Sequence, residues 1–326
     1  MHLLVLTNNP DTASFRYRIG VYLDLLRRQG IDSEVARLPG SLLERRALFA
    51  SAQHADAVLL QRKVLTAWDG FWLRRYARRV IYDFDDAVMY ADRKGGRGSR
   101  IRFHRFGRSV ALSDLVIAGN GYLAEHAQQY NTNVRVLPTG LDLGPYRESA
   151  PRKDDGTVRL VWIGSHSTLR YLQEIGPVLD TLASRFPHVV LRIICDAFFD
   201  LEVMKVEKRL WSEPTAAADL ASSDIGLAPL PDNPFTRGKC GFKILQYQAA
   251  GLPVVASPVG VNAQYVRDGG TGFLARDAAQ WLDRLSTVVE NRELRRALGC
   301  AGQRAVESFD VAVIGASFCR LIEESL

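Results

Sequence analysis

Short apolar runs alternate with amphipathic stretches along the first part of the chain. Short aliphatic runs predict strands buried on both faces of a parallel sheet, and apolar positions repeating every three or four residues predict helices. The predicted strands are Leu3–Thr7, Ala57–Gln61, Val80–Phe84, Leu115–Ala118 and Val134–Leu137. The predicted helices lie near residues 15–29, 40–53, 66–78, 100–112 and 120–130. This alternation is typical of a parallel sheet covered by helices.

A second series of the same kind follows residues 139–157, which are rich in glycine, proline and charge and are expected to form a linker. Its predicted strands are Arg159–Ile163, Val189–Cys195, Ile225–Pro229 and Val254–Ser257. Its predicted helices lie near residues 170–185, 216–222, 241–250, 277–289 and 291–307, and an amphipathic helix follows from Val311 to Leu326. A chain of 326 residues can bury two cores, so we expect two doubly wound α/β domains.

Ligands of doubly wound domains bind at the carboxyl ends of the strands, so the residues that follow each strand are the candidates for chemistry. Neither domain has the glycine fingerprint of a dinucleotide-binding turn after its first strand, which disfavours a nicotinamide-dependent dehydrogenase. Polar candidates at strand ends are Ser14, Arg16, Arg18, Asp83, Asp85, Asp86, Asn120, Gly164, Ser165 and His166. Each alone is explained as a helix cap or a surface residue, but together they predict a site.

Residues 238–260, GKCGFKILQYQAAGLPVVASPVG, predict a helix that opens on glycine and leads into a buried strand. Lys239, Lys243 and Gln246 are spaced i, i+4, i+7, which places them on one face of that helix. A helix N-terminus beside two lysines suits a phosphate group, and Gln246 suits a sugar hydroxyl. A packed strand–loop–helix with solvated lysines explains the spacing equally well.

The net charge of +6 is concentrated in the first half of the chain, where residues 1–150 hold 22 lysines and arginines against 15 acids. Most of the excess lies in residues 93–108, RKGGRGSRIRFHRFGR, which contain no acid. This run fits a solvated face, or a surface for a membrane or phosphorylated lipid. Nucleic acid ranks lowest, because none of its recognition motifs accompanies the run.

Four scattered cysteines, the lack of a membrane-spanning apolar stretch and the lack of a signal peptide predict a cytoplasmic protein with reduced thiols.

The segment 238–260, with GGTGFLA at residues 269–275, resembles the donor-binding segment of family-4-type glycosyltransferases, also called glycosyl transferases group 1, of the GT-B fold. ADLASSDIGLAPLPD (residues 218–232), VWIGSHST and VLPTGLD also match. The resemblance implies two Rossmann-like domains facing each other across a cleft. Residues 1–145 would form the acceptor-side domain and residues 146–309 the donor domain, with helix 310–326 packing back on the first.

The family usually has two glutamates in the donor segment, and here Gly238 and Gln246 occupy their positions. Ser165 stands where an arginine is common, so Lys239, Lys243 or Arg170 must supply the positive charge. The position of the family's catalytic histidine aligns with Asp85, next to Asp86.

The resemblance therefore implies catalytic roles for Asp85, Asp86 and Lys239. The implied contacts to the donor diphosphate and nucleotide are Gly164, Ser165, His166, Lys239, Cys240, Gly241, Phe242, Lys243 and Gln246. The residues expected on the acceptor or phosphate side are Ser14, Arg16, Arg18 and Asn120.

The expected activity is transfer of a sugar from a nucleotide-diphosphate sugar to an acceptor hydroxyl, with retention of configuration and without a metal or other cofactor. The acceptor would be a glycan, a lipid-linked molecule or a phosphorylated molecule in cell-surface polysaccharide or glycolipid synthesis. Residues 93–108 would contact an anionic membrane at its inner face, and no nucleic acid would take part. The alternatives are a non-catalytic nucleotide-sugar binding or scaffold protein, and a sugar-nucleotide epimerase of the same architecture.

Overall fold

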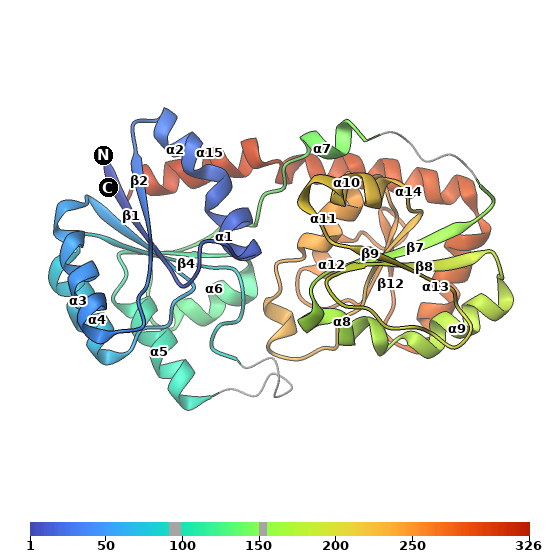
Figure 1. The fold of residues 1–326 in the computed structure, drawn as a ribbon, viewed down its shortest axis with the longest axis horizontal. Helices are drawn as coiled ribbons and strands as arrows, with labels where there is room; N and C mark the ends of the chain where they lie inside the picture. Colours follow the sequence, from blue (N-terminus) through green and yellow to red (C-terminus); the bar gives the residue numbers. More distant parts are fainter. Residues whose placement is uncertain (91–98, 150–154) are drawn as a thin grey trace. The chain divides into compact units, whose positions relative to one another are not determined.

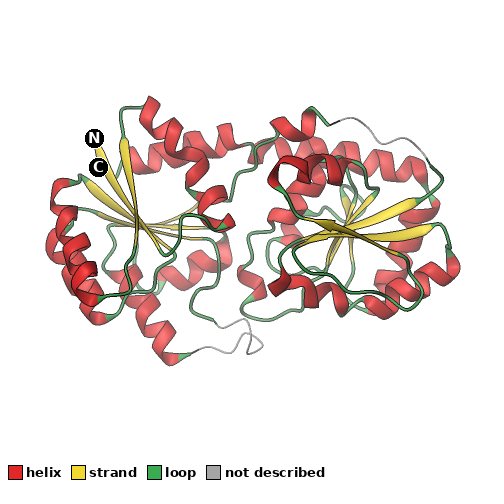
Figure 2. Ribbon diagram, viewed as in Figure 1, coloured by secondary structure: helices red, strands yellow, loops and turns green. Residues whose placement is uncertain are grey.

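The computed structural model describes residues 1–90, 99–149 and 155–326, and these divide into two compact units. Unit 1 comprises Met1–Gly140, Asn233–Cys240 and Phe309–Leu326, and unit 2 comprises Leu141–Asp232 and Gly241–Ser308. Each unit is built on one six-stranded parallel sheet with helices on both faces (Figures 1 and 2). The segment Asn233–Cys240 groups with unit 1, whereas the sequence places it in the donor domain.

The sheet of unit 1 has the strand order β2-β1-β3-β4-β5-β6. Its strands are β1 (His2–Thr7), β2 (Asp32–Arg37), β3 (Ala57–Gln61), β4 (Val80–Phe84), β5 (Leu115–Ala118) and β6 (Val134–Val136). The five strands predicted from apolar runs are confirmed. The sequence missed β2, because this edge strand, DSEVAR, is polar and half-exposed along its length.

Helices cover both faces of this sheet. They are α1 (Ala13–Arg18), α2 (Leu23–Arg28), α3 (Leu42–Ser51), α4 (Ala67–Tyr76), α5 (Arg100–Ala111), α6 (Gly121–Gln128) and α15 (Val311–Glu323). The helix expected over residues 15–29 is in fact α1 and α2 joined by a 3-10 turn, Gly20–Tyr22. The C-terminal α15 packs beside α2 and the 3-10 turn before it, where Phe318 stacks on Tyr22 of that turn with ring centroids 5.1 Å apart.

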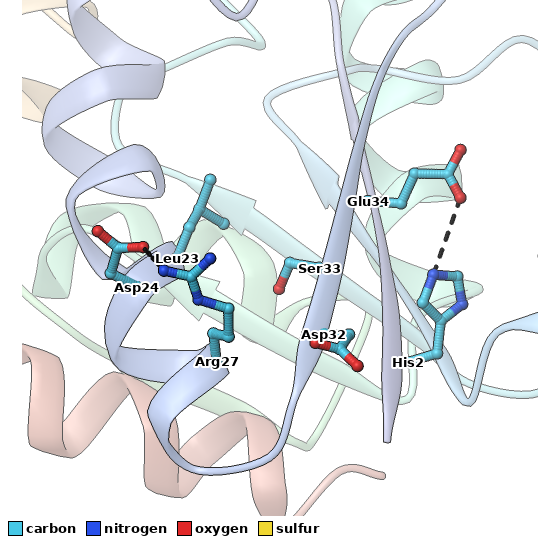
Figure 3. A pocket seen from close by; sticks show the side chains of 7 residues that line it. All are labelled: His2, Leu23, Asp24, Arg27, Asp32, Ser33 and Glu34. Atoms are coloured by element: carbon cyan, nitrogen blue, oxygen red, sulfur yellow. Dashed lines mark hydrogen bonds and ion pairs between the residues drawn. The ribbon is translucent and has the colours of Figure 1, made fainter.

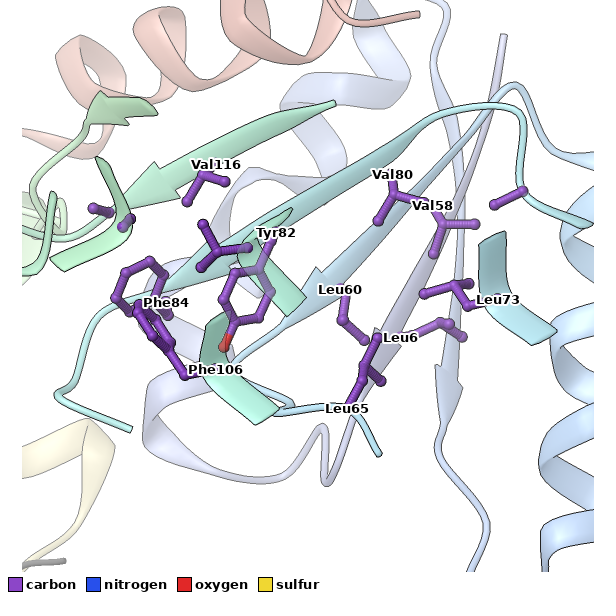
Figure 4. Packing of buried hydrophobic residues seen from close by; sticks show 14 of the residues in the cluster. Leu6, Val58, Leu60, Leu65, Leu73, Val80, Tyr82, Phe84, Phe106 and Val116 are labelled. Atoms are coloured by element: carbon purple, nitrogen blue, oxygen red, sulfur yellow. The ribbon is translucent and has the colours of Figure 1, made fainter. Parts of the chain in front are cut away.

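The opposite face of the unit 1 sheet carries a core of aromatic and aliphatic side chains beneath α3, α4, α5 and α6. Figure 4 shows Tyr82 and Phe84 of β4 meeting Phe106 of α5. The rings of Phe84 and Phe106 lie edge to face, 5.2 Å apart. Strand β4 is therefore buried on both sides, which fixes the position of the charged residues at its carboxyl end.

The sheet of unit 2 has the order β12-β11-β10-β7-β8-β9. Its strands are β7 (Val158–Ile163), β8 (Val189–Cys195), β9 (Val206–Leu210), β10 (Ile225–Ala228), β11 (Val254–Ala256) and β12 (Gly272–Leu274). The four predicted strands are confirmed. The two that the sequence missed form the edges: β9 is mostly charged and exposed, and β12 is only three residues long.

The helices of unit 2 are α7 (Gly144–Arg147), α8 (His166–Gln173), α9 (Gly176–Arg185), α10 (Glu213–Ala221), α11 (Phe242–Ala249), α12 (Asn262–Tyr265), α13 (Ala278–Glu290) and α14 (Arg292–Val306). The helix expected over residues 170–185 is two helices, because Pro177 lies in the first turn of a new helix that begins at Gly176, and proline is disfavoured inside a continuous one. Helix α14 packs closely on the end of α11, and Gly299 permits the approach: a Cβ there would lie 2.0 Å from the carbonyl oxygen of Gly251.

We predict that Gly299→Ala lowers the melting temperature, although alanine favours a helix over glycine by about 1 kcal/mol. The added Cβ would meet the Gly251 carbonyl, and such overpacking costs roughly 1–3 kcal/mol. Thermal unfolding followed by circular dichroism measures the change. Cys300→Ala, at the exposed next position of α14, is the control. A melting temperature equal to or above that of the wild type would contradict this contact.

Candidate functional site

Six charged side chains of unit 1 gather where β3 and β4 end, and we call them the charged cluster. They are Arg18, Arg62, Asp83, Asp85, Asp86 and Lys239. Strands β3 and β4 are parallel neighbours, with Gln61 opposite Asp83, so the residues that follow them meet at one edge of the sheet. Sequence analysis predicted every member except Arg62.

The innermost pair of the cluster is Arg18 and Asp83. Arg18 Nη2 lies 2.8 Å from Asp83 Oδ1, both side chains are almost wholly buried, and the guanidinium also donates to the Leu137 carbonyl. Burial raises the pKa of Asp83 to about 6 against the lowering effect of Arg18. These contacts give Arg18 a structural role, tying α1 to the ends of β4 and β6.

Asp85 lies at the end of a hydrogen-bond chain that crosses the sheet edge. Thr7 Oγ1 donates to Gln61 Oε1 at 2.7 Å, and Gln61 Nε2 donates to Ser14 Oγ at 3.3 Å. Ser14 Oγ in turn donates to Asp85 Oδ1 at 3.1 Å. The predicted pair Ser14 and Asp85 is thus brought into direct contact, and the chain fixes the orientation of the carboxylate.

Asp86 is the carboxylate that two cations share. Lys239 Nζ lies 3.2 Å from Asp86 Oδ1, and Arg62 Nη2 lies 2.7 Å from Asp86 Oδ2. Burial alone would raise the pKa of Asp86, but Lys239 and then Arg62 hold it below its ordinary range. The ammonium of Lys239 also lies 4.4 Å from the centre of the Phe235 ring.

The expectation that Lys239 lies on the face of the donor-segment helix is wrong. Helix α11 begins at Phe242. The preceding residue, Gly241, has a left-handed conformation with φ +66°, so the backbone changes direction before the helix starts. Lys239 therefore lies three residues ahead of the helix, in extended backbone, and is counted with unit 1.

Asn120 anchors the segment that carries Lys239. Its amide nitrogen donates to the carbonyls of Gly238 and Lys239, at 3.2 and 3.4 Å, while its oxygen caps α6 by accepting from the Leu123 N–H. Gly238 packs so tightly that a Cβ would lie 2.7 Å from the Ala87 Cβ. The position of the family's first glutamate is thus filled by neighbouring atoms.

Unit 2 places Lys243 against the end of β7. Its ammonium lies 3.8 Å from the centre of the Trp162 ring and 3.5 Å from Thr168 Oγ1. A Cβ at Gly164 would lie 2.5 Å from Lys243 Nζ, so the predicted donor residues Gly164 and Lys243 do meet. Lys243 is the second residue of α11, next to Phe242, which opens that helix.

Ser165 is the N-cap of α8, and its hydroxyl is 3.0 Å from that of Ser167. His166 opens α8, and its backbone N–H donates to Asp196 Oδ1 at 2.8 Å. Asp196 is a neighbour that the sequence did not predict.

Gln246, the residue at the second glutamate position, is buried within unit 2. Its amide nitrogen donates to Tyr146 Oη at 3.2 Å, which ties α11 to the short helix α7. Cys240 is half-buried and interacts electrostatically with Arg62 and Lys239, and the guanidinium of Arg16 lies over the ring of Tyr17.

Two cavities lie away from these residues. One, of about 240 Å³ at the amino ends of β1 and β2, is lined by His2, Leu23, Asp24, Arg27, Asp32, Ser33 and Glu34 (Figure 3). Another, of about 590 Å³, lies at the amino ends of β7, β10 and β11 and includes His188 and Arg296. Neither cavity contains a predicted site residue, because those residues follow the carboxyl ends of the strands.

Within residues 1–90, 99–149 and 155–326, His, Cys, Asp and Glu side chains nowhere form a group of three suited to a metal ion. In the same ranges, every helix is too short or too polar to cross a bilayer.

Residues 199–291 match the sequence model of the family described as Glycosyl transferases group 1. D-inositol 3-phosphate glycosyltransferase of Nocardia farcinica is 26% identical over 58% of this chain and 48% of its own length. Phosphatidyl-myo-inositol mannosyltransferase of Mycobacterium tuberculosis is 28% identical over 57% of this chain and 53% of its own. The chain thus spans about half the length of these curated relatives.

The structure of the Anabaena protein HepE in complex with UDP-glucose is similar to this chain with a TM-score of 0.73, at 16% identity. The similarity covers 99% of this chain and 100% of that one. The predicted GT-B fold and the resemblance to group 1 glycosyltransferases are confirmed.

We predict that restoring the family's first glutamate, Gly238→Glu, destabilises the chain by roughly 1–3 kcal/mol, because its side chain must displace Ala87 and Leu123. Thermal unfolding measures the loss. Gly40→Glu is the matched control: it adds the same side chain to unit 1 where a Cβ meets nothing within 4 Å. Equal melting temperatures for the two variants would show that position 238 has room.

Proposed function

We propose that this chain, which resembles the group 1 glycosyltransferases in fold and in residues 199–291, transfers a sugar from a nucleotide-diphosphate sugar to an acceptor hydroxyl. The observation that carries the proposal is the charged cluster, where Asp85 and Asp86 are ionically linked to Arg62 and Lys239. The UDP-glucose complex of the Anabaena protein supports a nucleotide-sugar donor, and the names of the two transferases support the transfer of a sugar.

We assign the donor diphosphate to Lys243 and the N-terminus of α11, and we carry over the contact from Lys239 as an expectation of the family resemblance. Breaking the bond at the anomeric carbon leaves negative charge on the diphosphate, which cationic groups and the unpaired N–H groups of a helix start stabilise. Gly164 supports the assignment, since only a glycine leaves room for the Lys243 ammonium beside Trp162. In a metal-free reaction these groups take the place of a divalent cation.

We assign Asp85 to the acceptor and the sugar ring. Its carboxylate, held by Ser14 Oγ, either orients and deprotonates the acceptor hydroxyl or stabilises the positive charge that develops on the ring. A transfer with retention of configuration is the expectation carried over from the family. Asp86 acts in this scheme through Lys239, whose ammonium it contacts.

The acceptor we propose is phosphorylated or lipid-linked, as in glycolipid or cell-surface polysaccharide synthesis. The names of the two relatives support it, since each contains an inositol phosphate or phosphatidyl-inositol acceptor.

Helix α5 carries the described part of the basic run: Arg100 and Arg105 are exposed, and Ile101 is 64% exposed beside them. Residues 93–98 lie outside the described residues. We propose that this helix contacts anionic lipid.

One observation favours the non-catalytic alternative. Neither position of the family's glutamate pair offers a carboxylate: Gly238 is enclosed, and Gln246 is bonded to Tyr146. A protein that binds a donor but shows neither transfer nor slow hydrolysis would fit that alternative.

The transferase proposal predicts that Asp85→Asn lowers turnover by about 10²- to 10⁴-fold while donor affinity changes little, because the carboxylate acts on the reacting groups. A thermal-shift screen of UDP-, GDP-, ADP- and dTDP-sugars first identifies the donor, since a ligand of the native state raises the melting temperature. Calorimetry and a radiolabelled-sugar assay then separate binding from transfer. Lys239→Ala should also lose orders of magnitude in turnover.

Asp24→Asn, at an exposed position on α2, is the control and should behave as wild type. Equal losses of binding and turnover in Asp85→Asn would indicate a structural role for that residue. Near-normal turnover in Lys239→Ala would remove Lys239 from the diphosphate.

The membrane proposal predicts that the chain floats with liposomes containing anionic lipid and not with neutral ones, and that added salt weakens the association because charges are screened over about 8 Å at physiological ionic strength. The double variant Arg100→Glu/Arg105→Glu should lose flotation. Lys205→Glu/Arg209→Glu makes the same charge change at exposed positions of unit 2 and should retain it. Equal binding to anionic and neutral liposomes would contradict the proposal and indicate that α5 is an ordinary solvent-exposed helix.

A further inference from the structure

The backbone turns sharply where β3 ends, and Arg62 is at the centre of the turn. Its φ of +56° lies in the left-handed region, where it is the sole non-glycine residue among those described. Lys63 N–H closes the turn by donating to the Gln61 carbonyl at 2.7 Å. A three-residue turn with positive φ at its centre is rare and strained, and glycine or asparagine adopts it at lower cost than arginine.

The strained turn directs the guanidinium of Arg62 across two successive carboxylates. Nε lies 3.4 Å from Asp85 Oδ1, and Nη2 lies 2.7 Å from Asp86 Oδ2. The backbone N–H of Arg62 also donates to the Asp83 carbonyl at 2.8 Å. Main chain and side chain therefore both join the end of β3 to the end of β4. Strain of this kind persists only where the surroundings enforce it, and it gathers at functional sites.

We propose that Arg62 is a positioning residue of the charged cluster: its strained turn holds one guanidinium across Asp85 and Asp86, so that both carboxylates keep their orientation and Asp86 is shared between Arg62 and Lys239. Without Arg62, Asp86 would keep Lys239 as its cationic partner, and Asp85 would lose its contact to the guanidinium. With Arg62, the Asp86 carboxylate is divided between two cations, and Asp85 is held by the same guanidinium, so these four side chains carry no net charge. The part of this role that concerns catalysis rests on the proposed transferase activity.

The titratable, charged and hydrogen-bonding groups of the charged cluster and its neighbours come from four parts of unit 1. Strand β4 and the turn after it contribute Tyr82, Asp83 and Asp85, α1 contributes Ser14 and Arg18, the turn after β3 contributes Arg62, and the segment 233–240 contributes Lys239 and Cys240. Burial acts against the ionisation of Asp86, and Lys239 and Arg62 are the cations in contact with Asp86 that oppose this effect.

The test is a carboxyl ¹³C NMR titration of Asp86 in the ligand-free protein, with the resonance assigned by its loss in Asp86→Asn. Arg62→Gly should raise the pKa of Asp86 by about one unit, because one of two contacting cations is lost. Arg62→Lys should give a smaller rise, since it keeps a charge but not the planar fork. Arg79→Ala, an exposed arginine of unit 1 outside the cluster, should leave Asp86 unchanged.

Two further readouts distinguish positioning from simple stabilisation. Arg62→Gly relieves the backbone strain that Arg62→Ala retains, although both variants lose the ion pairs. The melting temperature of Arg62→Gly should therefore be higher than that of Arg62→Ala. If Asp86 must be ionised for transfer, the acid limb of the kcat/KM profile should move to higher pH in Arg62→Gly, by the same amount as the NMR titration. Arg62→Asn, which also accepts positive φ, replaces Arg62→Gly if that variant fails to fold.

An Asp86 titration that does not change in folded Arg62→Gly overturns the inference. A shifted titration with full transfer activity overturns its catalytic part. A shifted titration in a protein that transfers no sugar from any donor leaves the positioning role in place, and the transferase proposal then fails separately.

Discussion

The carboxylate of Asp86 contacts two cations, Arg62 in the turn after β3 and Lys239 more than a hundred residues later in the chain. The candidate site of unit 1 depends on this shared contact. Fully exposed ion pairs contribute about 0–1 kcal/mol, and wholly buried ones carry a large desolvation cost. The side chains of Asp86, Lys239 and Arg62 are 20%, 23% and 29% exposed, which places this network between the two limits. It also accounts for the grouping of Asn233–Cys240 with unit 1, because this ion pair and the two bonds from Asn120 hold the segment there.

The sequence predicted the interior of both sheets well and their edges poorly. Strands such as β3 and β4 are buried on both faces, so a continuous apolar run marks them, and their predicted bounds agree with the structure to the residue. Strands β2 and β9 lie at sheet edges, and their polar sequences carry the alternation of neither a helix nor a half-buried strand. Their positions follow from pairing with a neighbour, which a single sequence does not show.

The candidate site was predictable where it depends on strand ends and unpredictable where it depends on backbone direction. Ser14 and Asp85 were named because each follows a strand, and the two are in contact. Lys239 and Lys243 have helical spacing, but the chain turns at the left-handed Gly241 between them. Lys239 belongs to unit 1 and Lys243 to unit 2. Arg62 follows β3 as directly as Asp85 follows β4, so that signal was present in the sequence. Its positive φ was not, because nothing in the residue type indicates it.

The departures of this chain from the family motif are consistent with one another when the neighbours of Gly238 are considered. A glutamate there would need the space that Ala87 fills, and Ala87 is the residue next to Asp86. The segment therefore lacks its own carboxylate but lies against one: Asp86 Oδ1 is 3.2 Å from the ammonium of Lys239, the residue after Gly238. In this arrangement a small residue at 238 allows the segment to approach the turn after β4, and the turn supplies the negative charge. An acid at position 238 would add a carboxylate next to Asp86, and the two would compete for the same cations, Lys239 and Arg62, so a small uncharged residue at 238 fits this turn.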